Sequence, residues 1–204
     1  MVRRIVFIFG VAAIALALNA CAKKPEAEES CNFVQNRDQQ RISWGASLPV
    51  RIYIDDSVEK QFHDDIMAAA KKWNEKIGHE VLRVSLATSR AGKPAQDGDN
   101  FIYQLKTWER DRMQEQARTT VYWSGDRIHE ADIRINDAAH EFATSSVLLP
   151  NRIDIESLLV HEFGHVLGLA HSDAPGSVMA KTLPSATPRR EPSKSDLNSI
   201  SCEY

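Results

Sequence analysis

Residues 161–171 read HEFGHVLGLAH, a stretch with three histidines, one glutamate and two glycines. Apolar residues recur before and within it at the three- and four-residue spacing of a helix, so His161 and His165 lie about one turn apart on the same helix face. Two imidazole nitrogens at that separation can bind one tetrahedral zinc ion. The stretch therefore predicts a metal site on a helix.

The other residues of the stretch complete this site. Gly168 can adopt a positive φ, end the helix and turn the chain, which allows His171 to reach the ion as a third ligand. Three neutral nitrogen ligands leave the fourth position for water, as in catalytic zinc sites. The ion lowers the pKa of that water to about 7, and Glu162 would accept its proton and return it to a leaving amine. We therefore expect one catalytic Zn²⁺ ion and a hydrolytic reaction.

Two alternatives give the histidines no catalytic role. They could be hydrogen-bonded side chains of an ordinary core helix, or they could hold a zinc ion that only stabilises the fold. The first requires the whole pattern to arise by chance, and the second leaves Glu162 without a role. The catalytic interpretation is therefore favoured.

Length and composition indicate one soluble globular domain. The chain has 204 residues, of which 43% are hydrophobic and 26% are charged, and this suits a domain with its own core. The net charge is −3, and the basic residues form no dense run beyond the pair Arg189-Arg190. Nucleic-acid binding needs a clustered basic footprint and is not expected. We expect the protein to be a monomer.

The N-terminus has the features of a bacterial export signal. Two arginines precede an apolar run over residues 5–18, which is shorter than the about 20 residues of a membrane-spanning helix. The sequence LNAC at 18–21 resembles the lipobox of bacterial lipoproteins. We therefore expect a signal peptide over 1–20 and a lipidated Cys21 that anchors the protein to a membrane of the cell envelope. Ala22 is compatible with the outer membrane; the alternative is plain secretion with Cys21 as an ordinary thiol.

Residues 22–41 are polar with few large apolar side chains, so we expect a tether over 21–41 and a folded domain over 42–204. In that domain, hydrophobic spacing and turn residues predict an α+β order. The expected strands are 48–54, 81–87, 101–105, 119–123 and 131–136, the last two as a hairpin. The first expected helix is 57–77 and ends at Gly78. The second is capped by Asp154 or Asn151 and runs to Leu167. The third is short and starts at Ser193 or Ser195. Residues 107–116 could form a loop or a short helix.

The histidine stretch resembles the zinc-binding motif H-E-x-x-H-x-x-G-x-x-H of the metzincin metallopeptidases. Ser172, directly after the third histidine, is similar to the matrixin branch, that of the matrix metalloproteinases. The sequence SVMA at 177–180 resembles the Met-turn of this branch, and 193–200 is similar to its last helix. The resemblance covers about residues 42–204.

This resemblance implies a metzincin-like catalytic domain. Its fold would be α+β, with a twisted mixed sheet of about five strands, a long N-terminal helix, a zinc helix and a C-terminal helix. The resemblance assigns the metal ligands to His161, His165 and His171 and the general base to Glu162. It makes Met179 the apolar floor beneath the metal.

The resemblance also implies how substrate binds. In the family, an edge strand pairs with an extended peptide, and backbone pairing of this kind tolerates many sequences. The corresponding residues here are Thr119, Thr120, Val121, Tyr122 and Trp123. A pocket wall that selects one substrate side chain should lie in 181–192, although its sequence does not match the wall of the family.

Two cysteines remain once Cys21 is lipidated. An exported protein meets oxidising conditions, so Cys31 and Cys202 are expected to form a disulfide. The alternative is that Cys31 binds the zinc as a latency switch. Its neighbours, Ser30 and Asn32, do not match the switch sequence of matrix metalloproteinases, so the disulfide is favoured.

Other potential metal ligands are interpreted conservatively. His129, Asp132, Asp137 and His140 could bind a metal but are expected to be surface residues. The sequence DGDN at 97–100 is expected to be a turn rather than a calcium loop. Calcium and a second zinc occur in the family, but neither is evident in this sequence.

The leading hypothesis is an exported, lipid-anchored zinc endopeptidase that hydrolyses peptide bonds of extracytoplasmic proteins by a metal-activated water. The main alternative is a lipoprotein module that holds zinc and binds an extended peptide without cleaving it, which leaves Glu162 unused. A purely structural lipoprotein requires the whole motif to be incidental.

Overall fold

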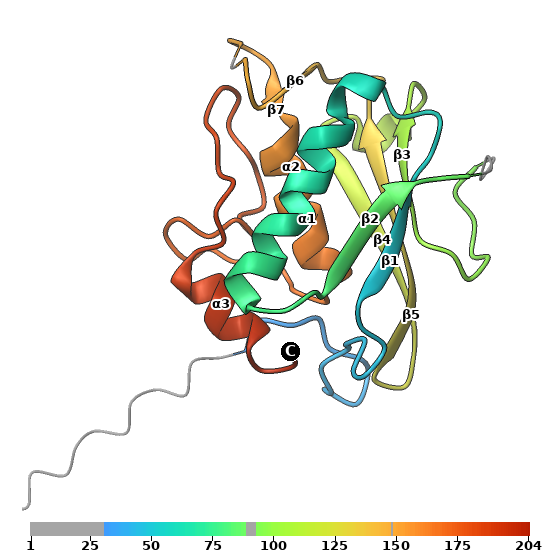
Figure 1. The fold of residues 1–204 in the computed structure, drawn as a ribbon, viewed down its shortest axis with the longest axis vertical. Coiled ribbons are helices and arrows are strands. Elements are labelled where there is room, and N and C mark those ends of the chain that lie inside the picture. The colour runs from blue at the N-terminus through green and yellow to red at the C-terminus, as the bar shows by residue number, and fades with distance from the viewer. Residues whose placement is uncertain (1–30, 89–92, 148) are drawn as a thin grey trace, which may run out of the picture.

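The computed structural model describes residues 31–88, 93–147 and 149–204, and Figure 1 shows its fold. One layer is a five-stranded mixed sheet of order β2-β1-β3-β5-β4. Neighbouring strands are parallel except for β4, which runs antiparallel to β5. The strands are β1 (Val50–Ile54), β2 (Leu82–Leu86), β3 (Phe101–Leu105), β4 (Ala117–Ser124) and β5 (Arg127–Asn136). A short parallel pair, β6 (Phe142–Ala143) and β7 (Ile153–Asp154), precedes the second helix.

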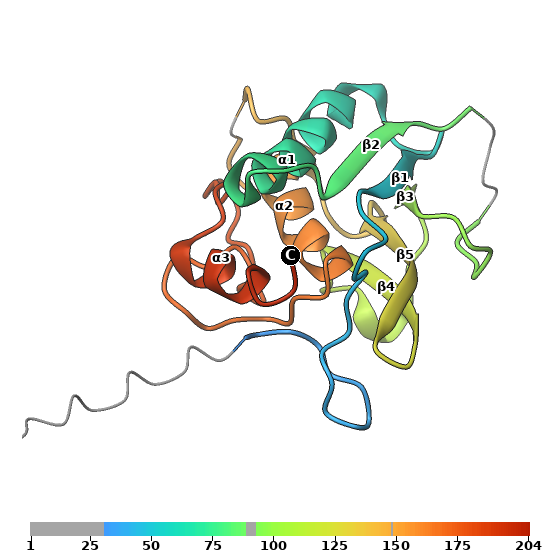
Figure 2. The ribbon, with the colours of Figure 1, turned by 60° about the horizontal axis from the view of Figure 1, so that its bottom comes forward.

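Helices cover one face of this sheet. The helices α1 (His63–Ile77) and α2 (Ile155–Val166) pack side by side on that face, and α3 (Lys194–Ile200) lies beside the end of α1 (Figures 1 and 2). Trp73 of α1 is fully buried, and its indole Nε1 donates a hydrogen bond to Val160 O of α2 at 2.9 Å. These layers confirm the predicted α+β fold.

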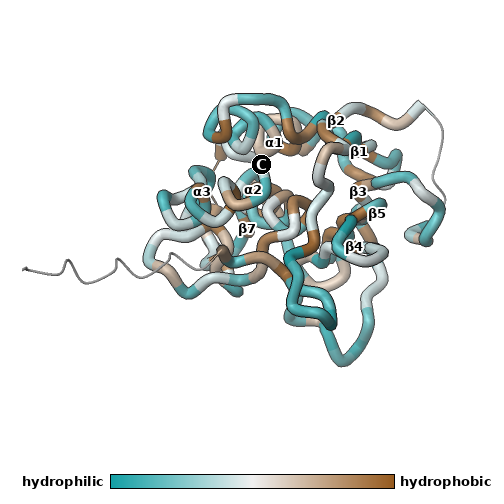
Figure 3. Tube along the Cα trace, turned by 90° about the horizontal axis from the view of Figure 1, so that it is seen from below, coloured by the Kyte–Doolittle hydropathy of each residue, from teal (hydrophilic) through white to brown (hydrophobic). Residues whose placement is uncertain are grey.

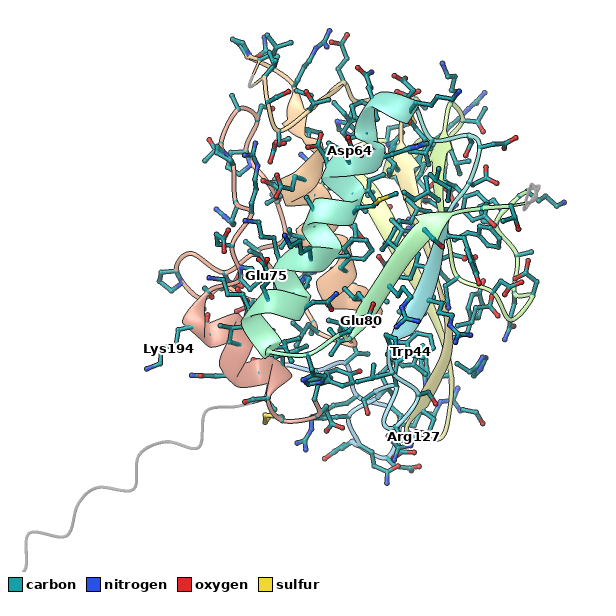
Figure 4. All side chains as sticks on the ribbon, viewed as in Figure 1. Trp44, Asp64, Glu75, Glu80, Arg127 and Lys194 are labelled. Atoms are coloured by element: carbon teal, nitrogen blue, oxygen red, sulfur yellow. A yellow bond between two sulfur atoms is a disulfide. The ribbon has the colours of Figure 1, made fainter. Side chains whose placement is uncertain are left out.

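The polar and apolar residues are distributed as this layering requires. Apolar segments lie between the helices and the sheet, and hydrophilic segments lie in the outer loops (Figure 3). The outer face of α1 carries charged side chains such as Asp64 and Glu75 (Figure 4). None of the helices in the described ranges combines the length and apolar character needed to cross a bilayer.

Capping residues set the helix ends. Gly78 has φ 92° and ends α1, and such a positive φ favours glycine. Asp154 caps α2 by accepting a hydrogen bond from Ser157 N, and Ser193 caps α3 in a capping box with Asp196. The structure therefore uses Asp154 rather than Asn151 as the cap of α2, and Ser193 rather than Ser195 as the cap of α3.

The first helix begins later than predicted. Its apolar spacing suggested 57–77, but α1 starts at His63 after a 3-10 turn, η1 (Lys60–Phe62). Asp55 explains the difference, because its carboxylate accepts a hydrogen bond from Ser57 N and its carbonyl accepts one from Val58 N. These bonds form a local turn that competes with helix formation.

The stretch 107–116, which the sequence left open, is a loop with one 3-10 turn, η2 (Arg110–Arg112).

The segment 31–41 differs from the expected tether. Phe33 is buried in the core, and its backbone forms an antiparallel bridge with Leu169. The predicted disulfide between Cys31 and Cys202 is present, with the Cα atoms 6.1 Å apart. These long-range contacts attach a polar segment to the fold. The expected signal peptide, Cys21 and the first part of the tether lie outside the described residues.

Candidate metal centre

The helix α2 presents two of the three predicted ligands. His161 and His165 lie four residues apart and face the same side, and their Nε2 atoms are 3.0 Å apart. Both rings lie between α2 and β4. The opposite face of α2 packs into the core through apolar residues such as Leu159 and Phe163. The period of the helix thus separates a packing face from a ligand face.

A tight bend brings in the third ligand. Gly168 has φ 98°; its N–H bonds to His165 O, and Leu169 N–H bonds to Gly164 O. This is the Schellman pattern of a helix end with a left-handed glycine. The chain reverses, and His171 Nε2 comes to 3.2 Å from His165 Nε2. In the described ranges, this is the one group of three potential ligands whose atoms all lie within 4.8 Å of one another.

The proton positions on two rings fit a metal site. Nδ1 of His161 lies 2.8 Å from Val178 O, and Nδ1 of His165 lies 2.8 Å from Leu169 O. A carbonyl oxygen only accepts, so each Nδ1 carries the proton and each Nε2 offers a lone pair. Two lone pairs that face each other repel unless a cation lies between them. The donor set therefore fits a divalent ion such as zinc, with its ligands oriented by backbone carbonyls.

Burial keeps these imidazoles neutral. Desolvation lowers the pKa of His161 and of His165 to about 4. A metal competes with protons for imidazole nitrogens, so a low pKa favours metal binding at neutral pH.

Glu162 is buried beside the ligands. Its carboxylate Oε2 accepts a hydrogen bond from the Thr119 hydroxyl of β4 at 2.6 Å. Burial raises the pKa of this carboxyl group above its ordinary value, so the carboxylate holds a proton more readily than an exposed one. The structure thus places a buried carboxylate beside the three histidines.

The residues of the predicted Met-turn pack against α2. Met179 is buried, and a Cβ on Gly164 would lie 2.2 Å from its sulfur, so a larger residue at that position of α2 would require the Met179 side chain to shift. The turn is tied to α3, because Asp196 accepts hydrogen bonds from the Ser177 hydroxyl and from Val178 N. Because Val178 O binds the His161 ring, the turn also orients a ligand.

A cleft of about 530 Å³ opens at the histidines. Of the predicted edge strand, Thr119, Val121 and Trp123 line it, whereas Thr120 and Tyr122 do not, as the alternation of a strand requires. The α2 side contributes Leu158 and Glu162 together with the histidines.

Only the first part of the expected pocket wall reaches the cleft. The wall residues that line it are Lys181, Thr182 and Leu183, and Leu183 O accepts a hydrogen bond from the Gln116 side chain. The later part of 181–192 turns away: the Arg190 side chain instead forms an ion pair with Asp154 at the start of α2.

One cleft residue comes from the segment that the sequence suggested was a tether. Val34 lines the cleft, as does Ile42, the first residue of the expected domain. Phe33 and Val34 are the apolar exceptions in a polar stretch, and they were the available signal that this stretch is part of the domain.

The alternative metal ligands do not converge. His140 Nε2 contacts Met113 O, and Asp132 accepts a hydrogen bond from Phe101 N. Asp132 is buried, so its interpretation as a surface residue is wrong; it satisfies a backbone donor inside the sheet. The sequence at 97–100 is a turn whose first two backbone N–H groups bond to Glu130.

Comparison with known families adds one finding. The family model described as Matrixin matches residues 65–204, which include α2, the bend, the Met-turn and α3. No match was found among curated proteins.

Proposed function

This chain belongs to the matrixin family, and we propose that it is a zinc-dependent endopeptidase that hydrolyses peptide bonds of extracytoplasmic proteins. One observation carries the proposal: three imidazole Nε2 atoms converge beside a buried carboxylate at the floor of a cleft. A binding site for zinc alone gains nothing from that carboxylate, whereas hydrolysis needs a proton acceptor at this position.

The roles of the residues follow from their positions. His161, His165 and His171 would hold the ion, which when bound supplies Lewis acidity to water and to the substrate carbonyl. The Thr119 hydroxyl donates a hydrogen bond to Oε2 of Glu162 and holds the carboxylate in place. This carboxylate would take the proton of the attacking water. Glu162 then returns this proton to the leaving amine, which completes the transfer without another acid.

The edge strand is suited to bind an extended peptide. In the described part of the chain, β4 pairs with β5 on one side only, and its other side faces the cleft. An extended substrate can add to this edge through its backbone, while side chains at alternate positions enter the cleft. The cleft walls are largely apolar, with Leu158, Val121 and Leu183 among them, so we propose that bound segments carry apolar side chains.

The site of action is inferred from the N-terminal sequence. The charged start, the apolar run and LNAC before residue 22 support removal of residues 1–20 and lipidation of Cys21 in a bacterial cell envelope. Residues 22–30 would then connect the anchor to the part of the domain that the structure describes from Cys31 onward. The disulfide between the two ends of this domain is consistent with an oxidising compartment.

One pair of measurements tests the activity. Glu162→Gln should retain bound zinc, measured by metal analysis, and lose the cleavage of an unfolded protein substrate. Glu75→Gln, an exposed change on α1, should retain both. If the zinc-loaded parent protein cleaves no unfolded protein, the function is peptide binding without cleavage, and the proposal fails.

A further inference from the structure

The three histidines are not supported equally. His161 and His165 stand on a helix, and each ring is oriented by a hydrogen bond from Nδ1 to a backbone carbonyl. His171 lies beyond the helix in an exposed position, and in the described ranges its Nδ1 has no such partner. The placement of its ring therefore depends on the backbone that carries it.

That backbone is held from one side by residues 32–34. The Asn32 side-chain amide donates to Ala170 O at 3.0 Å and to His171 O at 2.9 Å. The Asn32 carbonyl accepts a hydrogen bond from Ala170 N at 2.9 Å, and Val34 N donates to Gly168 O at 2.8 Å. The segment thus runs beside the whole bend from the glycine to the third histidine.

On the other side of the same backbone, Ser172 N donates to Met179 O at 2.9 Å. The peptide groups that flank His171 are therefore fixed in two directions. With its backbone torsions set, the Cα–Cβ bond of His171 can point only toward the other two rings.

The segment 31–34 is itself anchored to α3 and the residues that follow. Cys31 forms the disulfide with Cys202, and Asn32 N donates to the Ser199 hydroxyl at 3.3 Å. Phe33, the next residue along the chain, is buried in the core. This anchoring segment precedes the family-matched range, 65–204.

We propose that Asn32 is a positioning residue for the third zinc ligand, and that the disulfide-anchored segment 31–34 is a structural part of the metal centre. The inference rests on the proposed function, since it needs the three histidines to bind zinc. Groups that orient a ligand from outside the coordination sphere typically contribute 10- to 100-fold in metal affinity. Asn32 does so through the backbone of His171 rather than through its ring.

The test is the zinc affinity of the full-length protein, measured by competition with a chromophoric chelator. Asn32→Ala should weaken zinc binding by about tenfold or more, while the metal-free variant keeps the circular dichroism spectrum of the parent. Asn36→Ala is the matched control. It removes an asparagine amide two residues beyond segment 31–34, which bonds to Gly125 O and Gln40 Oε1 rather than to the residues around His171, and should leave zinc affinity unchanged.

A second variant covers the case in which Asn32→Ala does not fold. Cys31→Ser/Cys202→Ser leaves the Asn32 amide in place and releases its anchor, so it should weaken zinc binding in the same direction by a smaller factor. Parental affinity in folded Asn32→Ala, or in the folded double variant, would overturn the inference. Failure of the proposed function is a different result, because the zinc-loaded parent protein would then cleave no unfolded protein, whatever the zinc affinity of these variants.

Discussion

Replacing Gly168 by alanine tests the bend that carries the third histidine. Two effects oppose a side chain at this position. The backbone has φ 98°, a conformation that L-residues rarely adopt, and an added Cβ would lie 2.6 Å from Ile42 O and 3.1 Å from the Phe33 ring. The nearest atom belongs to the backbone, so it cannot move aside as the tip of a flexible side chain can.

These two effects can be separated by a matched glycine. A left-handed backbone costs a non-glycine residue about 1–2 kcal/mol, and overpacking of a tight contact costs about 1–3 kcal/mol. Gly78 also ends a helix and has φ 92°, but a Cβ there would meet nothing within 4 Å. Gly78→Ala should therefore lose only the first amount, whereas Gly168→Ala should lose about 2–5 kcal/mol in total.

Urea unfolding of the metal-free proteins measures both free energies without a contribution from zinc. The expected result is a larger loss for Gly168→Ala than for Gly78→Ala, together with weaker zinc binding in the first variant only, because relief of the collision displaces the path to His171. Equal losses of unfolding free energy in the two variants would show that Phe33 and Ile42 do not pack tightly against the bend at Gly168.

Three further perturbations address the carboxylates and the metal. Thr119→Val removes the hydroxyl that bonds to Glu162. Because hydrogen bonds to charged groups contribute about 1.5–3 kcal/mol, kcat should fall about 10- to 100-fold with zinc content unchanged. Thr119→Ser should restore kcat, and a normal kcat in the valine variant would refute the positioning role of Thr119. Burial raises the pKa of Asp132 to about 7, so the folded protein holds this proton more tightly than the unfolded chain. The free energy of unfolding of the parent should therefore fall as pH rises from about 4 to about 7. Asp132→Asn, which keeps the acceptor for Phe101 N, should lose less of its free energy of unfolding in urea titrations across this range. Saturating zinc at about 100 times its dissociation constant should raise the free energy of unfolding by about 2.7 kcal/mol, and calorimetry that shows no change on adding zinc or a chelator would contradict a site formed only in the folded state.

The histidine site was predictable because most of its information is local. The four-residue spacing of His161 and His165 and the glycine at the helix end act within eleven consecutive residues, and helix geometry converts that spacing directly into positions. The helix caps Asp154 and Ser193 were narrowed to two choices each for the same reason. At Asp55, before α1, a local turn competes with the first turn of a helix, and hydrophobic spacing alone gave the wrong helix start.

Contacts between distant parts of the chain could not be predicted in this way. The hydrogen bond between Thr119 and Glu162 joins residues that are 43 positions apart, and neither residue type indicates the pairing. Segment 31–41 looked like a tether because its composition is polar, but a disulfide and a bridge to Leu169 compensate for its small apolar area. Composition measures how much apolar surface a segment can bury by itself, not how it is attached to the rest of the fold.

The helix α3 supports the metal centre along two separate paths. Asp196 holds the turn whose Val178 carbonyl orients the ring of His161. Ser199 binds Asn32, which in turn holds the backbone of His171. Because two of the three proposed ligands depend on one helix, movement of α3 would displace both at once, and zinc binding and the docking of α3 should stabilise each other by the same free energy. The C-terminal helix is therefore part of what defines the metal centre, although none of its side chains is among the three potential ligands.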